Sequence, residues 1–344
     1  HCGEKHCGDA RIPARALPGR LQDTDEERGL VELTIGIDVG GTKIAAGVAD
    51  PSGKILDRLR TATPAGGAEA VEDGIAEVAL TLRKRHDAVA VGLAVAGLVD
   101  EKRSTMRFAP NLPMADRPLR ESISARVGLP VVVENDANAA AWGEYRFGGG
   151  RGVDDVVLIT VGTGLGGGIV LDGRLLRGAF GGAAELGHVR LVPDGLPCGC
   201  GRNGCWEQYT SGSALVREAK ALASGDPRRA ARLLELSGGT ATAIDGRMVS
   251  KAAAEGDPAA CELFARLGRW LGEGISLVAD VLDPAAVVVG GGVCEAGDLL
   301  LEPARQSFAK TLSMADHRPH LKILAAQLGN DAGILGAADL ARLP

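Results

Sequence analysis

The sequence predicts an α/β fold whose two halves are built alike, and three observations point to it. The chain has 344 residues, about the length of two domains, and 45% of them are apolar, which is enough to build cores. A strand-like stretch, a Gly/Thr turn and a second strand-like stretch occur at 32–50 and again at 154–173. Between them, an apolar run leads directly into an alanine-rich helical segment at 128–150. Alternating strands and helices are typical of α/β architectures.

The first 32 residues differ from the rest of the chain. They lack an initiating Met, the apolar core of a signal peptide and a helical period, so we expect residues 1–32 to form a disordered tail. His1, Cys2, His6 and Cys7 could bind a metal, but a segment that cannot bury itself favours a solvated tail. A start site chosen too far upstream would look the same.

Charge and hydropathy exclude several classes of partner. The net charge is −6 and acidic and basic residues are interspersed, so no basic stripe indicates nucleic acid or an anionic membrane. The longest apolar run, Ala88 to Val99, is too short to span a bilayer and is interpreted as a buried strand and turn. With no export signal we expect a cytoplasmic protein with reduced thiols, whose partners are small molecules.

The first strand pair is predicted at ELTIGIDVGGTKIAAGVAD, residues 32–50. It reads as a hairpin whose tip exposes backbone N–H groups beside Asp38. DDVVLITVGTGLGGGIVLDG at 154–173 repeats the design, with Gly162 in the place of Gly40. One such turn could equally be an ordinary hairpin. Two of them suggest an internal duplication with a nucleotide between the halves.

The glycines of the second hairpin also fit a dinucleotide-binding pattern. Gly162, Gly164 and Gly167 match G-x-G-x-x-G, but that motif needs a helix after the turn, and the segment that follows is strand-like. We therefore reject a Rossmann fold. The P-loop and protein-kinase signatures are absent from the sequence.

A third glycine run follows the amphipathic segment 261–282. Val287 to Val289 form a short buried strand that ends in Gly290, Gly291 and Gly292. Glycines there allow close approach to the backbone, by an adenine or ribose or by a tight crossover to the next helix.

The segment 128–150 ends its strand in two acids that flank an amide, just before a helix. An acid at this place can bind hydroxyls and accept a proton. Helix capping by Asp136 or Asn138 explains the spacing equally well. Three further polar residues near a cysteine loop favour a site that binds a polyol over simple helix capping: Glu185, His188 and Glu207.

The cysteine loop CGCGRNGCWEQ at 198–208 suggests a metal site. Cys198, Cys200 and Cys205 supply three of the four ligands that zinc prefers, and His188 is the nearest candidate for the fourth. A Cys3His set with no open position indicates a structural zinc site, and the alternative is a reduced cluster without metal. Two cysteines without such partners are expected to be buried packing residues: Cys261 and Cys294.

Five motifs taken in order resemble the ROK family (repressors, open reading frames, sugar kinases), most closely its actinobacterial-type ATP-dependent glucokinases. The resemblance covers the chain from about Leu33 to its end. The motifs are DVGGT at 38–42, ENDAN at 134–138, GTGLGGG at 162–168, ELGH at 185–188 and CGCGRNGCWEQ at 198–208.

The resemblance implies a duplicated actin-like ATPase (ribonuclease H-like) α/β fold of two domains with an active-site cleft between them. The small domain would span 33–140 and be completed by the C-terminal helix 331–344. The large domain would span 141–330 and carry the zinc loop.

The resemblance also implies that the protein is a glucokinase with assigned residue roles. Asp136 resembles the general base that takes the proton of the glucose 6-hydroxyl as it attacks the γ-phosphate of ATP. The implied sugar ligands are Asn135, Asp136, Glu185, His188 and Glu207, with His188 offering one ring nitrogen to zinc and the other to a hydroxyl. The residues implied around the phosphates and Mg²⁺ are Asp38, Gly40, Gly41, Thr42, Lys43, Thr163 and Gly164, with Gly290 and Gly291 near the adenosine.

Other functions of the family stay open. Relatives phosphorylate N-acetylmannosamine, N-acetylglucosamine, fructose or allose, and some use polyphosphate as the donor. The family's sugar-responsive repressors carry an N-terminal helix-turn-helix, and the tail of this chain has neither a helical period nor a basic face. The resemblance further implies a homodimer or a tetramer.

Overall fold

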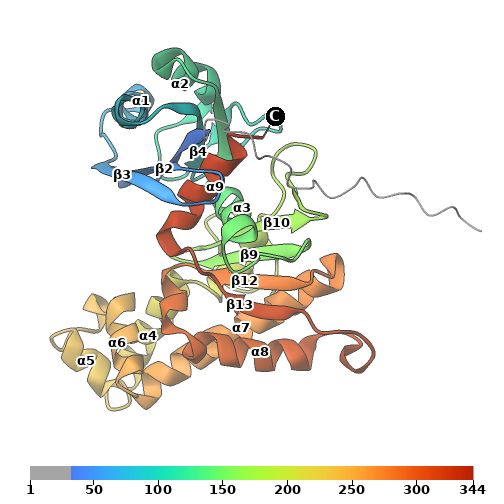
Figure 1. The fold of residues 1–344 in the computed structure, drawn as a ribbon. Helices are drawn as coiled ribbons and strands as arrows, with labels where there is room; N and C mark the ends of the chain where they lie inside the picture. The colour runs from blue at the N-terminus through green and yellow to red at the C-terminus, as the bar shows by residue number, and fades with distance from the viewer. Residues whose placement is uncertain (1–31, 344) are drawn as a thin grey trace, which may run out of the picture. The chain divides into compact units, whose positions relative to one another are not determined.

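Two five-stranded sheets of the same strand order form the frame of the protein (Figure 1). The structure, a computed structural model, describes residues 32–343, so the predicted tail and its His and Cys residues lie outside it except for Glu32. The first sheet has the order β3-β2-β1-β4-β8 and the second β11-β10-β9-β12-β13. In each sheet three antiparallel strands are extended by two parallel ones. This matched order agrees with the duplication that the two hairpins predict.

The strands of the first sheet are β1 (Leu33–Val39), β2 (Lys43–Ala49), β3 (Ile55–Ala62), β4 (Ala88–Val95) and β8 (Val131–Asn135). Those of the second are β9 (Val156–Val161), β10 (Leu165–Leu171), β11 (Arg174–Leu175), β12 (Ala286–Gly290) and β13 (Lys322–Ala325). A small third sheet consists of β5 (Leu98–Val99), β6 (Met106–Phe108) and β7 (Ala115–Arg117). Both predicted hairpins are present, and the segment after Gly164 is a strand, which agrees with rejecting the Rossmann fold.

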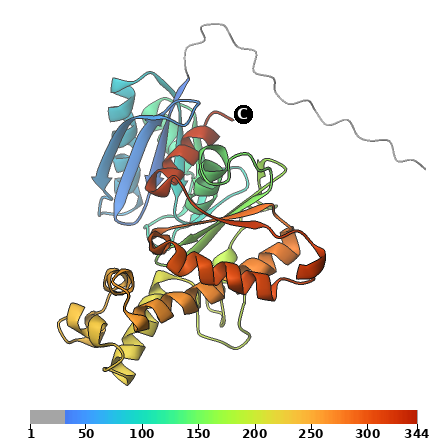
Figure 2. The same ribbon diagram turned by 60° about the horizontal axis from the view of Figure 1, so that its bottom comes forward.

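Helices cover both faces of the two sheets. On the first sheet α1 and α2 pack on one face and α9 on the other, while α3 contacts both sheets. On the second sheet α4, α7 and α8 cover the face opposite α3, and α7 and α8 run side by side (Figure 2). The helices are α1 (Ala68–Arg85), α2 (Leu119–Val127), α3 (Asp136–Phe147), α4 (Gly212–Gly225), α5 (Ala231–Leu236), α6 (Gly246–Ala254), α7 (Pro258–Leu282), α8 (Asp298–Thr311) and α9 (Ala332–Leu340).

Helix α9 lies unusually close to the first sheet because glycines face it. A Cβ on Gly36 would lie 1.9 Å from the carbonyl oxygen of Ile334, and one on Gly92 would lie 1.8 Å from that of Ala337. Such distances are far inside van der Waals contact, so only glycine fits. The C-terminal helix thus packs on the sheet formed by the first part of the chain. The division into two domains stays a prediction, and α3 runs through the boundary expected at residue 140.

The apolar run Ala88 to Val99 forms β4, a turn and β5, as predicted. Among the helices of residues 32–343, none has the length and apolarity needed to cross a membrane. Cys261 and Cys294 are half-buried and pack against the core beside the second sheet, so the prediction that they are packing residues is confirmed, whereas their full burial is not. They lie at the edge of the core, Cys261 in the second turn of α7 and Cys294 in a short 3-10 segment after β12.

Candidate active site and cysteine cluster

The end of β8 and the start of α3 carry the predicted catalytic residue. Asn135 is the N-cap of α3, because its side-chain oxygen accepts a hydrogen bond of 3.0 Å from the backbone N–H of Asn138. Its amide nitrogen donates to the carbonyl oxygen of Gly97 at 3.0 Å. The alternative in which Asp136 or Asn138 caps the helix is therefore wrong. Asp136, the first residue of α3, follows the cap directly.

Asp136 is half-buried, and its surroundings favour the protonated form of its carboxyl. Burial raises the pKa of this carboxyl, and the backbone N–H groups of Ala137 and of Asp136 itself oppose the rise. Asp38, near the tip of the first hairpin, has a pKa raised to about 6 by burial and by the charge of Asp136, against the lowering effect of Lys43. The fold thus places the first hairpin close enough to Asp136 for the two charges to interact.

Glu185 joins this group from the second half of the chain. Burial raises the pKa of its carboxyl, the charges of Asp136 and Glu207 raise it further, and His188 lowers it. The charge of Asp136 therefore raises the pKa of two predicted site carboxyls that come from distant segments, Asp38 and Glu185.

The four predicted zinc ligands lie together. Their ligand atoms are all within 4.8 Å of one another. The sulfurs of Cys200 and Cys205 are 3.5 Å apart, and the Cys198 sulfur lies 3.7 Å from Nδ1 of His188. A tetrahedral zinc with Zn–S bonds of about 2.3 Å separates its ligand atoms by roughly 3.8 Å. The spacing of this cluster therefore fits a single tetrahedral metal ion.

The three thiols differ in how readily they ionise when no metal is bound. Burial raises the pKa of Cys198 to about 12, and burial raises that of Cys205 as well. A hydrogen bond from the backbone N–H of Arg202 leads the effects that lower the pKa of the exposed Cys200 to about 6. Without a metal only one of the three is readily a thiolate. A dication would stabilise all three as thiolates, the form that binds zinc.

Glycines shape the loop that carries the cysteines. Gly201 and Gly204 have φ of 87° and 78°, a region that disfavours other residues. A Cβ on Gly204 would lie 1.7 Å from the carbonyl oxygen of Val192, so the loop closes only with glycine there. Gly199, by contrast, has open space around its Cα and no positive φ.

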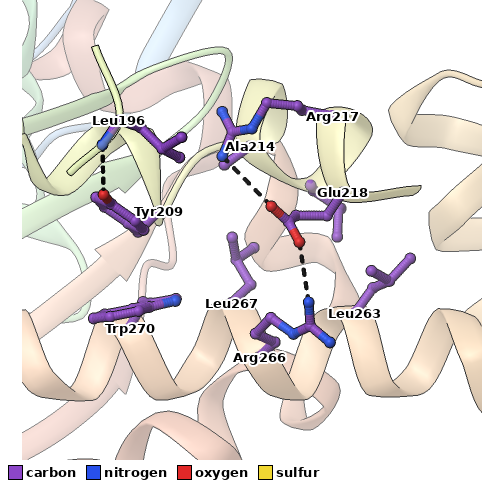
Figure 3. A pocket seen from close by; sticks show the side chains of 10 residues that line it. Leu196, Tyr209, Ala214, Arg217, Glu218, Leu263, Arg266, Leu267 and Trp270 are labelled. Atoms are coloured by element: carbon purple, nitrogen blue, oxygen red, sulfur yellow. Dashed lines mark hydrogen bonds and ion pairs between the residues drawn. The ribbon is translucent and has the colours of Figure 1, made fainter. Parts of the chain in front are cut away.

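Aromatic residues fasten the cysteine loop to α7. The hydroxyl of Tyr209 accepts a hydrogen bond of 2.8 Å from the backbone N–H of Leu196, and its ring lies 4.9 Å from that of Trp270 (Figure 3). Trp206 donates to the carbonyl oxygen of Trp270 at 3.0 Å and packs where Gly274 leaves room. A cavity of about 240 Å³ opens beside these aromatics, and none of the predicted site residues lines it.

His188 and Glu207 connect the cluster to the second hairpin. Each lies in a one-turn 3-10 helix, Leu186–His188 and Trp206–Gln208. Glu207 accepts a hydrogen bond of 3.0 Å from the Cys198 thiol and lies 3.7 Å from Nδ1 of His188. Its other carboxylate oxygen would be 3.0 Å from a Cβ on Gly164. Glu207 therefore borders both the cluster and the hairpin tip.

The tips of the two hairpins are open. A Cβ on Gly162 would have no atom within 4 Å, and one on Gly40 would meet only a carbonyl oxygen at 3.4 Å. Four of the seven predicted phosphate-site residues are exposed, namely Gly41, Thr42, Thr163 and Gly164, and the other three, Asp38, Gly40 and Lys43, are half-buried. The main chain of the second tip is held by hydrogen bonds of 2.7 Å from Gly212 N–H to the Gly162 carbonyl and 2.8 Å from the Ser213 hydroxyl to the Thr163 carbonyl.

The third glycine run has a structural reason of its own. Gly291 has a φ of 89°, and a Cβ there would lie 2.5 Å from the carbonyl oxygen of Val161 in β9. The close approach of the β9 backbone therefore requires a glycine at position 291. Gly290 is buried at the end of β12, whereas Gly292 has open space around it.

Two residues outside the predicted set lie against it. A Cβ on Gly41 would be 2.7 Å from the carbonyl oxygen of Asn111, so this residue borders the first hairpin tip. Arg177 makes an ion pair with Glu134, which precedes Asn135. No motif marks either residue, because each contact joins segments that are distant in the chain.

Comparisons with known proteins match this fold and site. Residues 34–343 match the model of the ROK family. The chain is 55% identical over 312 residues to the glucokinase of Streptomyces coelicolor, covering 91% of this chain and 98% of the relative. It is 36% identical over 308 residues to the glucokinase of Thermotoga maritima, covering 89% and 96%.

The solved structure of a ROK family glucokinase from Streptomyces griseus, in complex with glucose and AMPPNP, is 56% identical. It has a TM-score of 0.82 and covers 90% of this chain and 99% of that one. These matches confirm the α/β fold of the ROK sugar kinases. With the paired sheets, the strand-end acid and the cysteine loop all present, the chain belongs to the ROK family.

Proposed function

We propose that this protein is an ATP-dependent glucokinase that transfers the γ-phosphate of ATP to the 6-hydroxyl of glucose. The observation that carries the proposal is the half-buried carboxylate of Asp136, which directly follows β8 and lies close enough to Asp38 and Glu185 to raise their pKa values. Relatives of more than half identity are glucokinases, and one binds glucose and AMPPNP in its crystal structure.

Asp136 would act as the general base. Its carboxylate accepts the proton of the 6-hydroxyl while that oxygen forms a bond to the γ-phosphorus, and the bond from phosphorus to the bridging oxygen breaks to release ADP. The pKa of Asp136, raised by burial, makes the carboxylate a stronger base than an exposed aspartate.

Hydrogen-bonding residues around Asp136 would orient the sugar. Glu185, His188 and Glu207 offer acceptors and a ring nitrogen for hydroxyl groups. The side chain of Asn135 uses one position on its oxygen and one on its nitrogen within the protein, which leaves one further acceptor and one further donor for the sugar.

A structural zinc would be held by His188, Cys198, Cys200 and Cys205, and it would supply rigidity to the loop that carries Glu207. Mg²⁺ bound with ATP would neutralise phosphate charge. The residues proposed around the phosphates and the Mg²⁺ are Asp38, Gly40, Gly41, Thr42, Lys43, Thr163 and Gly164, with Gly290 and Gly291 near the adenosine.

The two-domain division with its cleft, the homo-oligomeric state and the cytoplasmic location remain predictions. The glucokinase relatives, one of them with bound glucose and AMPPNP, support glucose and ATP as the preferred pair over another hexose, an N-acetylhexosamine or polyphosphate.

ADP release by the purified protein tests the proposal. The assay supplies Mg·ATP with glucose, mannose, fructose, N-acetylglucosamine or N-acetylmannosamine in turn, and phosphoryl transfer from polyphosphate to glucose is measured separately. We expect glucose and ATP to give the highest kcat/KM. Asp136→Asn should lower kcat by about 10²-fold or more while glucose still binds. Unchanged turnover in that variant would remove Asp136 from the mechanism, and no turnover with any sugar would refute the kinase.

A further inference from the structure

Arg177 reaches from the second half of the chain into the first. It follows β11 and begins the segment that leads to Glu185 and His188. Its two terminal nitrogens donate hydrogen bonds of 2.8 Å to the carbonyl oxygens of Asp100 and Glu101, just after β5. Only 10% of its side chain is exposed. A planar guanidinium is suited to such a two-pronged contact.

The same guanidinium meets a buried carboxylate beside the catalytic strand end. Nε of Arg177 lies 2.8 Å from Oε2 of Glu134, as an ion pair whose N–H is not aligned for a hydrogen bond. Glu134 is 1% exposed, and its Oε1 accepts hydrogen bonds from Asn135 N–H and from the Asn138 side chain. Arg177 thus contacts Glu134, the carboxylate whose hydrogen bonds to Asn135 and Asn138 fix the start of α3.

A second contact docks the segment that Arg177 begins. A Cβ on Gly181 would lie 2.2 Å from the carbonyl oxygen of Val99, so the two backbones touch. The carbonyl oxygen of Arg177 accepts a hydrogen bond of 3.1 Å from Ala183 N–H, which closes the segment on itself. Both contacts precede Glu185, so the docked segment fixes where the chain enters the Leu186–His188 turn.

We propose that Arg177 is a positioning residue that couples the segment carrying Glu185 and His188 to the strand end carrying Asp136. Arg177 would keep the sugar ligands Glu185 and His188 at a fixed position relative to the general base Asp136, although these residues come from different halves of the fold. This inference rests on the proposed kinase function.

A matched control is built into the site. Arg103 also faces Oε2 of Glu134, with its Nε at 3.1 Å, but it belongs to the first half, and its side chain forms no hydrogen bond with the described segment 177–184. If Arg177 only neutralised Glu134, losing either arginine would have the same effect. If it couples the two halves, only the loss of Arg177 should disturb sugar binding.

The experiment compares Arg177→Met with Arg103→Met in the full chain. Glucose KM comes from steady-state kinetics, and glucose Kd comes from the fluorescence of the tryptophans, one of which, Trp206, adjoins Glu207. For Arg177→Met we expect both to rise about tenfold or more, with ATP KM changed by less than about twofold. For Arg103→Met we expect less than about threefold change in either glucose value.

Arg177→Lys provides a second variant that is less disruptive to folding. A lysine keeps the positive charge beside Glu134, but it lacks the planar guanidinium that donates one hydrogen bond to each of the two carbonyl oxygens. We expect glucose KM between those of the wild type and Arg177→Met. Equal glucose values for the two Met variants, or a fully wild-type Lys variant, would overturn the coupling. A wild-type protein that phosphorylates no sugar would instead refute the proposed function.

Discussion

Asp136 lies near two other carboxyl groups, those of Asp38 and Glu185, which are also negatively charged when ionised. Asp38 and Glu185 both feel its negative charge, and all three carboxyls have a pKa raised chiefly by burial. Such crowding is costly for folding, and it is tolerated at sites where a proton has to be accepted or a cation bound.

The acid limb of the pH profile should report this environment. The general base must be deprotonated to act, and burial raises the pKa of Asp136, so kcat/KM for glucose should fall as the pH drops through a value above the 3.8 of an ordinary aspartate. The slope should approach tenfold per pH unit. A profile measured between pH 4 and 8, with protein stability checked at each pH, tests this. Activity that stays flat down to pH 4 would contradict it.

Replacing Asp38 should stabilise the protein at neutral pH. Because its folded pKa, about 6, lies above the unfolded value of 3.8, the folded state binds this proton more tightly. Its favourable contribution is complete below about pH 3.8 and is lost as the pH rises through 6. Asp38→Asn should therefore raise the free energy of unfolding by about 1 to 3 kcal/mol at pH 7.5 and by almost nothing near pH 4.

Urea unfolding of the metal- and nucleotide-free protein measures that difference. The exposed Asp87 offers a control, and Asp87→Asn should change stability by less than about 0.5 kcal/mol. A less stable Asp38→Asn variant at pH 7.5 would mean that the ionised carboxylate is held by favourable contacts instead.

The sequence predicts which residues form this site better than it predicts which contacts those residues make. The acid at the end of β8 follows from an apolar run that stops at Glu134, a local signal. The identity of the capping residue could not be predicted, because the Asn135 side chain is also held by a hydrogen bond to the carbonyl oxygen of Gly97, which is distant in the sequence. The role of Arg177 could not be predicted from the sequence for the same reason, because its partners lie in the other half of the chain.

At the scale of elements, the cysteine loop has little regular structure of its own. Its strand-like pairings are two isolated β-bridges, Arg190 with Cys205 and Pro197 with Asn203, and further backbone hydrogen bonds close its turns. A metal ion at the four converging ligands would add a further connection between these turns. The four ligands could be predicted from the sequence because three of them, Cys198, Cys200 and Cys205, lie within eight residues and are separated by glycines.

Removal of one ligand should test that connection. Cys200→Ser should reduce bound zinc from about one per chain to well below that, and raise glucose KM at least about tenfold, because Glu207 shares the loop. Metal analysis and sugar kinetics are the measurements. Cys261→Ser is the matched control, since its thiol lies outside the cluster, 3.6 Å from a carbonyl oxygen. Unaltered zinc content in Cys200→Ser would exclude that residue as a ligand.

At the scale of the whole molecule, the two sheets repeat one topology, and sequence patterns predict only part of it. The hairpins β1-β2 and β9-β10 are predictable because their turns are marked by glycine and threonine. β11 has two residues, and β13 has four with only one buried, so neither shows a pattern that identifies it. Their pairing depends on the sheets already being in place.

The close packing of α9 against α3 should be essential to this architecture. A Cβ on Gly336, in the middle of α9, would lie 1.7 Å from the carbonyl oxygen of Ala139 in α3. Gly336→Ala should therefore force the helices apart and lower the free energy of unfolding by about 1 to 3 kcal/mol or more, despite alanine's higher helix propensity. Gly225→Ala, at the end of α4 with open space around it, should leave stability unchanged or slightly raised. Urea midpoints with unchanged slopes measure both. Equal midpoints for the two variants would mean that α9 can move away from α3 at no cost, and that this helix does not fix the first sheet against the rest of the fold.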